Sequence, residues 1–155
     1  MCKKCWITVF VLFAVLSGVA YKFIYQGNTV EGSDGRTAVV LNAAEKDLLL
    51  TEMRTFLTVV QQITTAVTKE DMQLVADSAR SVGGVAQAAV PASMTVKLPL
   101  EFKRLGFDTH SQFDLLALDA EQLGDPKHSL KQLSHLMKNC LACHATYRVQ
   151  LEETK

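Results

Sequence analysis

Cys140, Cys143 and His144 are the residues whose types and spacing can do chemistry in this sequence, and they form a Cys-x-x-Cys-His motif near its carboxyl end. Two thiols three positions apart on a helix project from nearly one side, so both can add to the vinyl groups along one edge of a haem. The imidazole that follows can then bind the iron as its proximal ligand. The motif therefore predicts one covalently attached haem c, with its iron held by His144.

The same three residues could serve three other roles, and the sequence argues against each. A thioredoxin-like dithiol needs a βαβ setting, whereas the pattern around the motif predicts helix. A disulfide between Cys140 and Cys143 is sterically poor inside a helix, because the Cβ vectors do not converge. A zinc site requires four ligands, and only three are clustered here.

An apolar segment near the amino terminus predicts export. Trp6–Ala20 contains no charged residue and follows Lys3 and Lys4. A secretory signal with cleavage near Gly18 is one interpretation, and a retained transmembrane helix of about 20 residues is the other. Aromatic residues at both ends favour the retained anchor, and the lysines keep the first residues in the cytoplasm. Both interpretations place the rest of the chain, including the haem motif, outside the cytoplasm.

The chain of 155 residues divides into a membrane anchor or signal segment (1–26), a polar linker (27–42) and a haem domain (43–155). The linker has the Gly, Ser and Asp content of a flexible spacer.

The formal net charge of zero argues against a nucleic-acid binder. Without Lys3, Lys4 and Lys22, 13 basic residues face all 16 acids, so the exported part carries −3. Cys2 and Cys5 precede the membrane segment and are interpreted as incidental thiols, with acylation or a redox role as alternatives.

In the haem domain, apolar residues recur at steps of three and four. This spacing predicts an all-α fold, an antiparallel four-helix bundle. The expected helices cover 43–67, 69–89 and 99–123, and the fourth starts at Pro126 with Asp125 as its cap. Gly124 separates the last two. The inner stripe of the fourth helix is expected to comprise Leu130, Leu133, Met137, Cys140, His144, Tyr147 and Leu151. Both cysteines and the histidine should then face the bundle interior.

These features resemble the cytochrome c-prime family of bacterial periplasmic cytochromes. The resemblance covers about residues 43–152 and rests on the bundle, its length and a late motif that continues as Cys143-His144-Ala145-Thr146-Tyr147-Arg148. Mitochondrial-type cytochromes c mostly carry the motif near the start of the domain. The resemblance implies a location on the periplasmic side of the bacterial inner membrane, anchored or free according to cleavage.

The resemblance also implies a first-helix residue on the far side of the iron. That residue is a methionine in six-coordinate electron carriers and a bulky, non-ligating group in five-coordinate members. Met53 occupies a position that can match it, although a plain core methionine would fit the same apolar stripe. His110 is the main rival ligand, but its polar neighbours favour a capping or surface role, and His128 and His135 are expected to face solvent.

Tyr147 is expected to pack on the haem. Arg148, four residues after His144, should lie on the neighbouring helical turn and tune the imidazole or meet a partner, or else be a solvated cation.

Two functions follow, and neither is that of a conventional enzyme, because no acid–base pair, nucleophile or second metal is evident. Single-electron transfer between unidentified redox partner proteins is the first, since a Met/His iron has both axial positions filled. The alternative is binding of nitric oxide or a similar small gas at a five-coordinate iron. Family resemblance further suggests a homodimer through the first two helices, where Gly83 and Gly84 would allow close approach.

Overall fold

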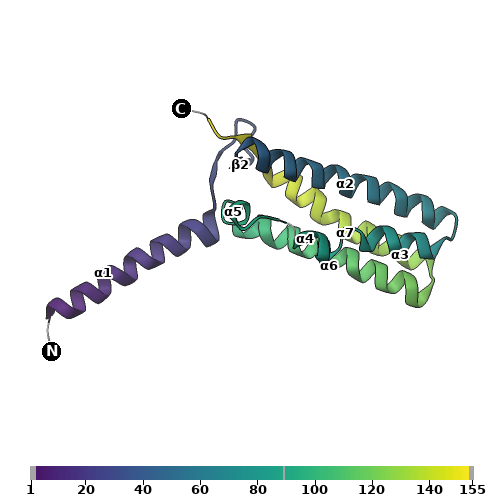
Figure 1. The fold of residues 1–155 in the computed structure, drawn as a ribbon, viewed down its shortest axis with the longest axis horizontal. Coiled ribbons are helices and arrows are strands. Elements are labelled where there is room, and N and C mark those ends of the chain that lie inside the picture. Colours follow the sequence, from purple (N-terminus) through teal and green to yellow (C-terminus); the bar gives the residue numbers. More distant parts are fainter. Residues whose placement is uncertain (1–2, 89, 154–155) are drawn as a thin grey trace.

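The computed structural model describes residues 3–88 and 90–153, and it is mostly helical (Figure 1). In chain order the elements are α1 (Lys3–Ala20), the π-helical turn η1 (Tyr21–Gln26), β1 (Thr29–Glu31), β2 (Thr37–Leu41), α2 (Ala43–Thr68), α3 (Met72–Arg80), α4 (Gly84–Gln87), α5 (Ala92–Thr95), α6 (Leu100–Leu123), α7 (Pro126–Thr146) and β3 (Tyr147–Leu151). A predominantly helical fold is therefore confirmed, whereas the small sheet was not predicted.

The three long helices begin where the sequence predicts. The Asn42 side chain accepts from the Glu45 N–H and the Glu45 carboxylate accepts from the Asn42 N–H, a reciprocal cap that starts α2. α6 follows Pro99 and ends at Leu123, and the next residue, Gly124, has a φ of 60° that suits a residue without a side chain. Asp125 caps α7 by accepting from two backbone N–H groups of its first turn.

The second predicted helix, 69–89, is wrong in extent. Asp71 caps α3, which ends at Arg80, and the separate short α4 follows. Gly83 and Gly84 interrupt the helix because the Asp114 side chain of α6 occupies the space beside Gly83 and accepts from the Gly84 N–H over 2.8 Å. The predicted end at Ala89 lies outside the described residues.

The fourth helix also ends earlier than its apolar stripe predicts. α7 stops at Thr146, and Tyr147–Leu151 forms β3. This strand pairs in parallel with β2, from Thr37 opposite Tyr147 to Leu41 opposite Leu151, and β1 adds to the other side of β2 in antiparallel register. An all-α fold and a flexible linker over 27–42 are both wrong, because the linker residues form two strands of this sheet.

Two apolar clusters hold the helices together. The larger one lies where α2, α3, α6 and α7 meet, and its most buried members include Ile63, Val75, Phe113, Leu116 and Leu133. The smaller one joins the sheet to the starts of α2 and α6. Its buried members are Val39, Leu41, Leu49, Met94 and Leu98. The sheet is thus packed onto the end of the helical domain where α7 finishes.

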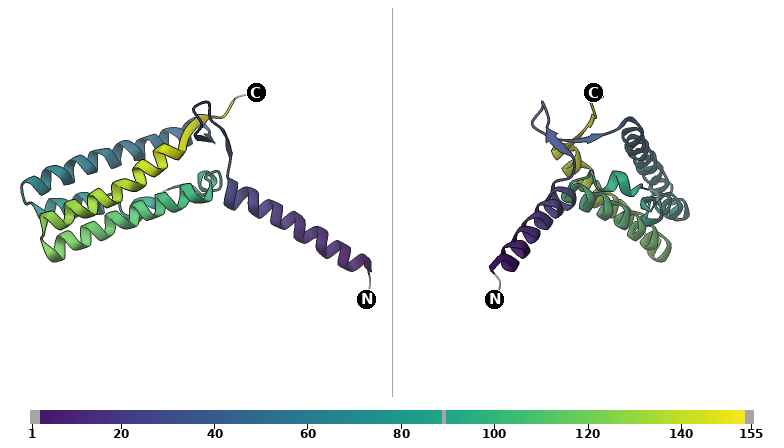
Figure 2. Two further views of the ribbon diagram at one scale, coloured as in Figure 1. Left: turned by 180° about the vertical axis from the view of Figure 1, so that it is seen from behind. Right: turned by 60° about the vertical axis from the view of Figure 1, so that its left-hand side comes forward.

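The segment Trp6–Gln26 is long and apolar enough to cross a membrane, as membrane anchors and signal sequences both are. No part of it is buried in the fold. It leaves the domain at the end that carries the sheet, and it points away from the long helices in Figure 1 and in the left view of Figure 2.

Candidate haem-attachment site

Cys140 and Cys143 lie in the last turns of α7 as free, half-buried thiols. Burial raises the pKa of the Cys140 thiol. Burial, together with the charge of the neighbouring Cys140, raises the pKa of Cys143 to about 11. Both side chains are therefore protonated thiols at neutral pH. No disulfide joins Cys140 to Cys143. Thioether bonds to a haem form from such free thiols.

His144 is exposed, so the prediction that it faces the interior is wrong. Successive helical residues turn by about 100°, and the buried face of α7 runs through Ser129, Leu133 and Leu136 toward the cysteines. His144 falls on the flank of that face, where Met137 is also exposed. Within the described residues the imidazole ring makes no hydrogen bond, so both ring nitrogens are available.

Arg36, from the hairpin that precedes the helical domain, binds the end of the motif helix. Its Nη1 donates to the carbonyl oxygens of His144 and Tyr147, over 3.1 Å and 3.3 Å. Its Nε and Nη2 donate to Asp34 Oδ2, over 2.9 Å and 2.6 Å, and this side-chain hydrogen bonding lowers the pKa of Asp34 to about 2. The cation therefore satisfies helix-end carbonyls where the macrodipole is negative.

Arg148 is in β3, not on a helical turn beside His144 as predicted. Its Nη1 donates to Ser33 Oγ over 3.0 Å and lies 3.6 Å from Asp34 Oδ2. The side chain thus belongs to the same turn of the hairpin as Arg36. Tyr147 packs edge-on against Phe102, with ring centroids 5.3 Å apart. Both residues tie the end of α7 to neighbouring elements.

Met53 is half-buried on α2 and packs against the smaller apolar cluster, and Tyr147 packs against the same cluster. The candidate first-helix ligand and the segment directly after His144 therefore contact one shared set of side chains. α2 begins, and α7 ends, at this end of the domain (Figure 1).

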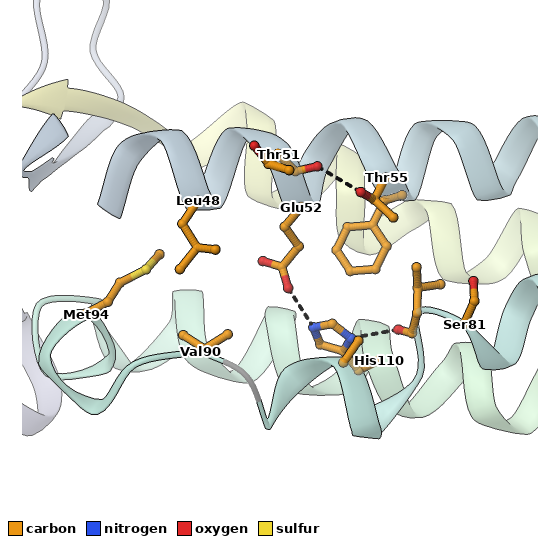
Figure 3. Close-up of a pocket in the computed structure, with 11 residues that line it drawn as sticks. Leu48, Thr51, Glu52, Thr55, Ser81, Val90, Met94 and His110 are labelled. Atoms are coloured by element: carbon orange, nitrogen blue, oxygen red, sulfur yellow. Dashed lines mark hydrogen bonds and ion pairs between the residues drawn. The ribbon is translucent and has the colours of Figure 1, made fainter. Parts of the chain in front are cut away.

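A cavity of about 210 Å³ lies between α2, α6 and the segment around α4 and α5 (Figure 3). Most of its lining is apolar and includes Leu48, Phe56, Val90 and Met94. Met94 is a member of the smaller apolar cluster and Val90 packs against it, so the cavity adjoins the cluster that Met53 contacts.

His110 is buried at the wall of this cavity, with 4% of its surface exposed, so the prediction of a surface histidine is wrong. Its Nδ1 lies 2.8 Å from the Val82 carbonyl oxygen, and its Nε2 lies 3.3 Å from Glu52 Oε1. Burial opposes protonation, but the Glu52 carboxylate and the Val82 carbonyl outweigh it and raise the pKa of His110. His128, predicted to face solvent, is half-buried against Asp119 at 2.9 Å, whereas His135 is exposed as predicted.

The donor set at the end of α7 fits a c-type haem. Two free thiols and an available imidazole lie within one turn and a half of helix. Leu141, between the thiols, keeps 72% of its surface exposed, an apolar surface that a bound porphyrin could cover. In the part of the chain that the structure describes, no three His, Cys, Asp or Glu side chains gather as a metal site. A haem iron does not need such a group, because the porphyrin supplies four of its ligands.

Sequence patterns could have revealed some of what was missed. The alternation in Tyr-Arg-Val-Gln-Leu and the β-branched run Thr37–Leu41 are both typical of strands. Arg36 carries no sequence signal, because its partners are backbone carbonyls distant in the chain. Gly83 and Gly84, which were expected at a dimer contact, lie beside Asp114 of the same chain.

In comparisons with known proteins, no family model, no curated protein and no solved structure matches this chain.

Proposed function

We propose that this protein is an exported, membrane-anchored monohaem c-type cytochrome that carries single electrons between redox partners on the periplasmic side of a bacterial inner membrane. The observation that carries the proposal is the arrangement at the end of α7, where two free, half-buried thiols precede an exposed imidazole that has no hydrogen-bond partner among the residues that the structure describes. The apolar segment Trp6–Gln26 supports export, which c-type attachment requires.

Each residue of the site has a distinct role in this proposal. Cys140 and Cys143 would hold the porphyrin edge through thioether bonds, and His144 would bind the iron. When bound, the haem would supply reversible one-electron chemistry. Arg36 holds the helix end that carries His144, and Tyr147 packs that end against α6.

We further propose that α2, α3, α6 and α7 correspond to the four helices of a cytochrome c-prime-like bundle, with Met53 as the sixth ligand. Contacts of these helices through one large apolar cluster support this proposal. The shared packing of Met53 and Tyr147 supports the ligand assignment, because it brings α2 to the end of the domain where the motif lies.

Covalent haem attachment is the direct test. The full chain is expressed in a host with c-type haem maturation, and haem that survives denaturation is stained on a gel. The wild type should stain, Cys140→Ser and Cys143→Ser should each stain more weakly, and the double variant should not stain. Undiminished staining in the double variant, or none in the wild type, would refute the proposal.

Gas binding is the second candidate, and the cavity beside His110 is the observation that favours it. A space of about 210 Å³ with mainly apolar walls can hold a diatomic molecule, and it adjoins the cluster around Met53. High-spin ferrous spectra with rapid nitric oxide binding would favour this function. Low-spin spectra in both oxidation states would favour electron transfer.

A further inference from the structure

The segment that joins the membrane helix to the helical domain is folded, and its contacts run without interruption from the membrane exit to the haem motif. A free linker over residues 27–42 would have an r.m.s. span of roughly 20–24 Å, enough for the domain to move between partners. We propose instead that this chain holds its haem at a fixed position beside the membrane and exchanges electrons with a redox protein embedded in that membrane. The proposal rests on the proposed function.

The first contact is at the membrane exit. Gly27 ends the π-helical turn with φ of 66°, and its N–H donates to the Lys22 carbonyl over 2.9 Å. The Asn28 N–H donates to the Lys97 carbonyl over 2.7 Å, just before α6. A side chain at Gly27 would collide with the backbone of Lys97–Pro99, so this close approach requires glycine. The residues that directly follow the membrane segment are therefore docked on the domain.

The second contact is the sheet. The Asn28 side chain donates to the Val40 carbonyl over 3.1 Å, and the Val40 N–H donates to the Asn28 carbonyl over 2.9 Å. β2 then pairs with β3 over five residues on each strand. β3 begins three residues after His144, so the strand that follows the membrane exit pairs with the strand that follows the haem motif.

The third contact is the Arg36 side chain on the His144 carbonyl, at 3.1 Å. Asp34 is fixed between Arg36 and Arg148, so the hairpin turn is held from both sides. The haem motif, the sheet and the membrane exit all lie at one end of the domain (Figures 1 and 2). Since the long helices extend away from α1, the motif end is the membrane-proximal end.

A partner in the same membrane fits this arrangement because both redox centres stay near one surface and meet by lateral diffusion. A soluble partner would have to reach a haem held close to the membrane, so the fixed position favours a partner embedded in the membrane. In this proposal, the haem of this chain passes electrons to or from the membrane-embedded partner at the membrane surface.

Distance from the membrane is the primary measurement. The holoprotein is reconstituted in phosphatidylcholine vesicles that contain a dansyl-labelled lipid headgroup, whose fluorescence the haem quenches. A twelve-residue Gly-Ser spacer is inserted between Gln26 and Gly27. The same spacer between Gly124 and Asp125, at the opposite end of the domain, is the matched control. We expect the first insertion to reduce quenching by at least half and the control to match the wild type. Equal quenching in all three proteins would overturn the proposal.

Electron transfer is the second measurement. One electron passes from the ferrous haem iron either to a ferrocenium-tagged lipid in the vesicle or to ferricyanide in solution. The spacer after Gln26 should slow oxidation by the lipid several-fold and leave oxidation by ferricyanide unchanged. An unchanged ratio of the two rates would indicate a tethered carrier with soluble partners. Covalent haem and helical content are measured first in each protein, so absence of haem in the wild type rejects the proposed function rather than this inference.

Discussion

The Nη1 atom of Arg36 donates a hydrogen bond of 3.1 Å to the carbonyl oxygen of His144, across 108 residues of sequence. The same nitrogen also donates to the Tyr147 carbonyl over 3.3 Å, where helix changes to strand. The last carbonyl groups of a helix have no partner within the helix, and a cation is favoured at this pole of the helix. This one side chain therefore links the hairpin to the candidate iron ligand.

Replacement of Arg36 by Ala should loosen the end of α7. Hydrogen bonds to a charged group contribute about 1.5–3 kcal/mol each, and exposure reduces that value, so we expect a loss of about 1–2 kcal/mol in the free energy of unfolding. Amide hydrogen exchange should accelerate in Tyr147–Leu151. Arg54→Ala is the control, because Arg54 is exposed and, among the described residues, its side chain bonds only to the Thr51 hydroxyl. Equal exchange rates in both variants would contradict this role for Arg36.

Replacement of Met53 by Leu tests the sixth ligand without opening a cavity. Leu and Met have similar volumes, so the free energy of unfolding should change by less than about 1.5 kcal/mol. If Met53 binds the iron, the long-wavelength absorption band that sulphur ligation gives to ferric haem should disappear. Met72→Leu, on α3, should keep the band. Retention of the band in Met53→Leu would move the ligand to another residue.

Glu45 and Lys97 should make stability depend on pH in the acid range. Burial raises the pKa of Glu45, but hydrogen bonds from Lys97 Nζ at 2.7 Å and from the Asn42 N–H outweigh it, and the pKa lies below the ordinary value. The folded state thus binds the proton less readily than the unfolded state. The stabilisation is present above the unfolded pKa, near 4.3, and is lost as pH falls through the lower folded pKa. Urea unfolding of Glu45→Gln should show a weaker decline of stability below about pH 4.5 than the wild type.

Gly83 should not tolerate a side chain, because a Cβ there would collide with the Asp114 carboxylate. Gly83→Ala would displace that carboxylate from the Gly84 N–H and cost about 1–3 kcal/mol in thermal or urea unfolding. Gly106→Ala is the matched control, since its added Cβ meets no atom within 4 Å and lies in helix α6. It should stabilise the protein by up to about 1 kcal/mol. A neutral effect of Gly83→Ala would contradict the stabilising role given to the Asp114–Gly84 hydrogen bond.

Local signals in the sequence determined most of the helical framework. Asn42 with Glu45, Gly124, and Asp125 with Pro126 mark the helix ends through contacts within a few residues, so the bounds of α2, α6 and α7 at these sites could be predicted. The chemistry of Cys140, Cys143 and His144 is likewise a matter of residue type and spacing. The apolar length of Trp6–Gln26 is a property of composition alone.

Only the tertiary structure decided where the elements end against one another and which way the site faces. The apolar residues of Tyr147–Leu151 continue the helical period of α7. The segment nevertheless forms a strand, because the edge of β2 offers it backbone hydrogen bonds along its whole length. The Asp114 carboxylate holds Gly84 between α3 and α4, where the periodic pattern predicted continuous helix, and the Glu52 and Val82 partners make burial of His110 favourable. His144 faces solvent because packing of Leu133 and Leu136 sets the rotation of α7 about its axis. These outcomes depend on partners far apart in the chain, which local periodicity does not encode.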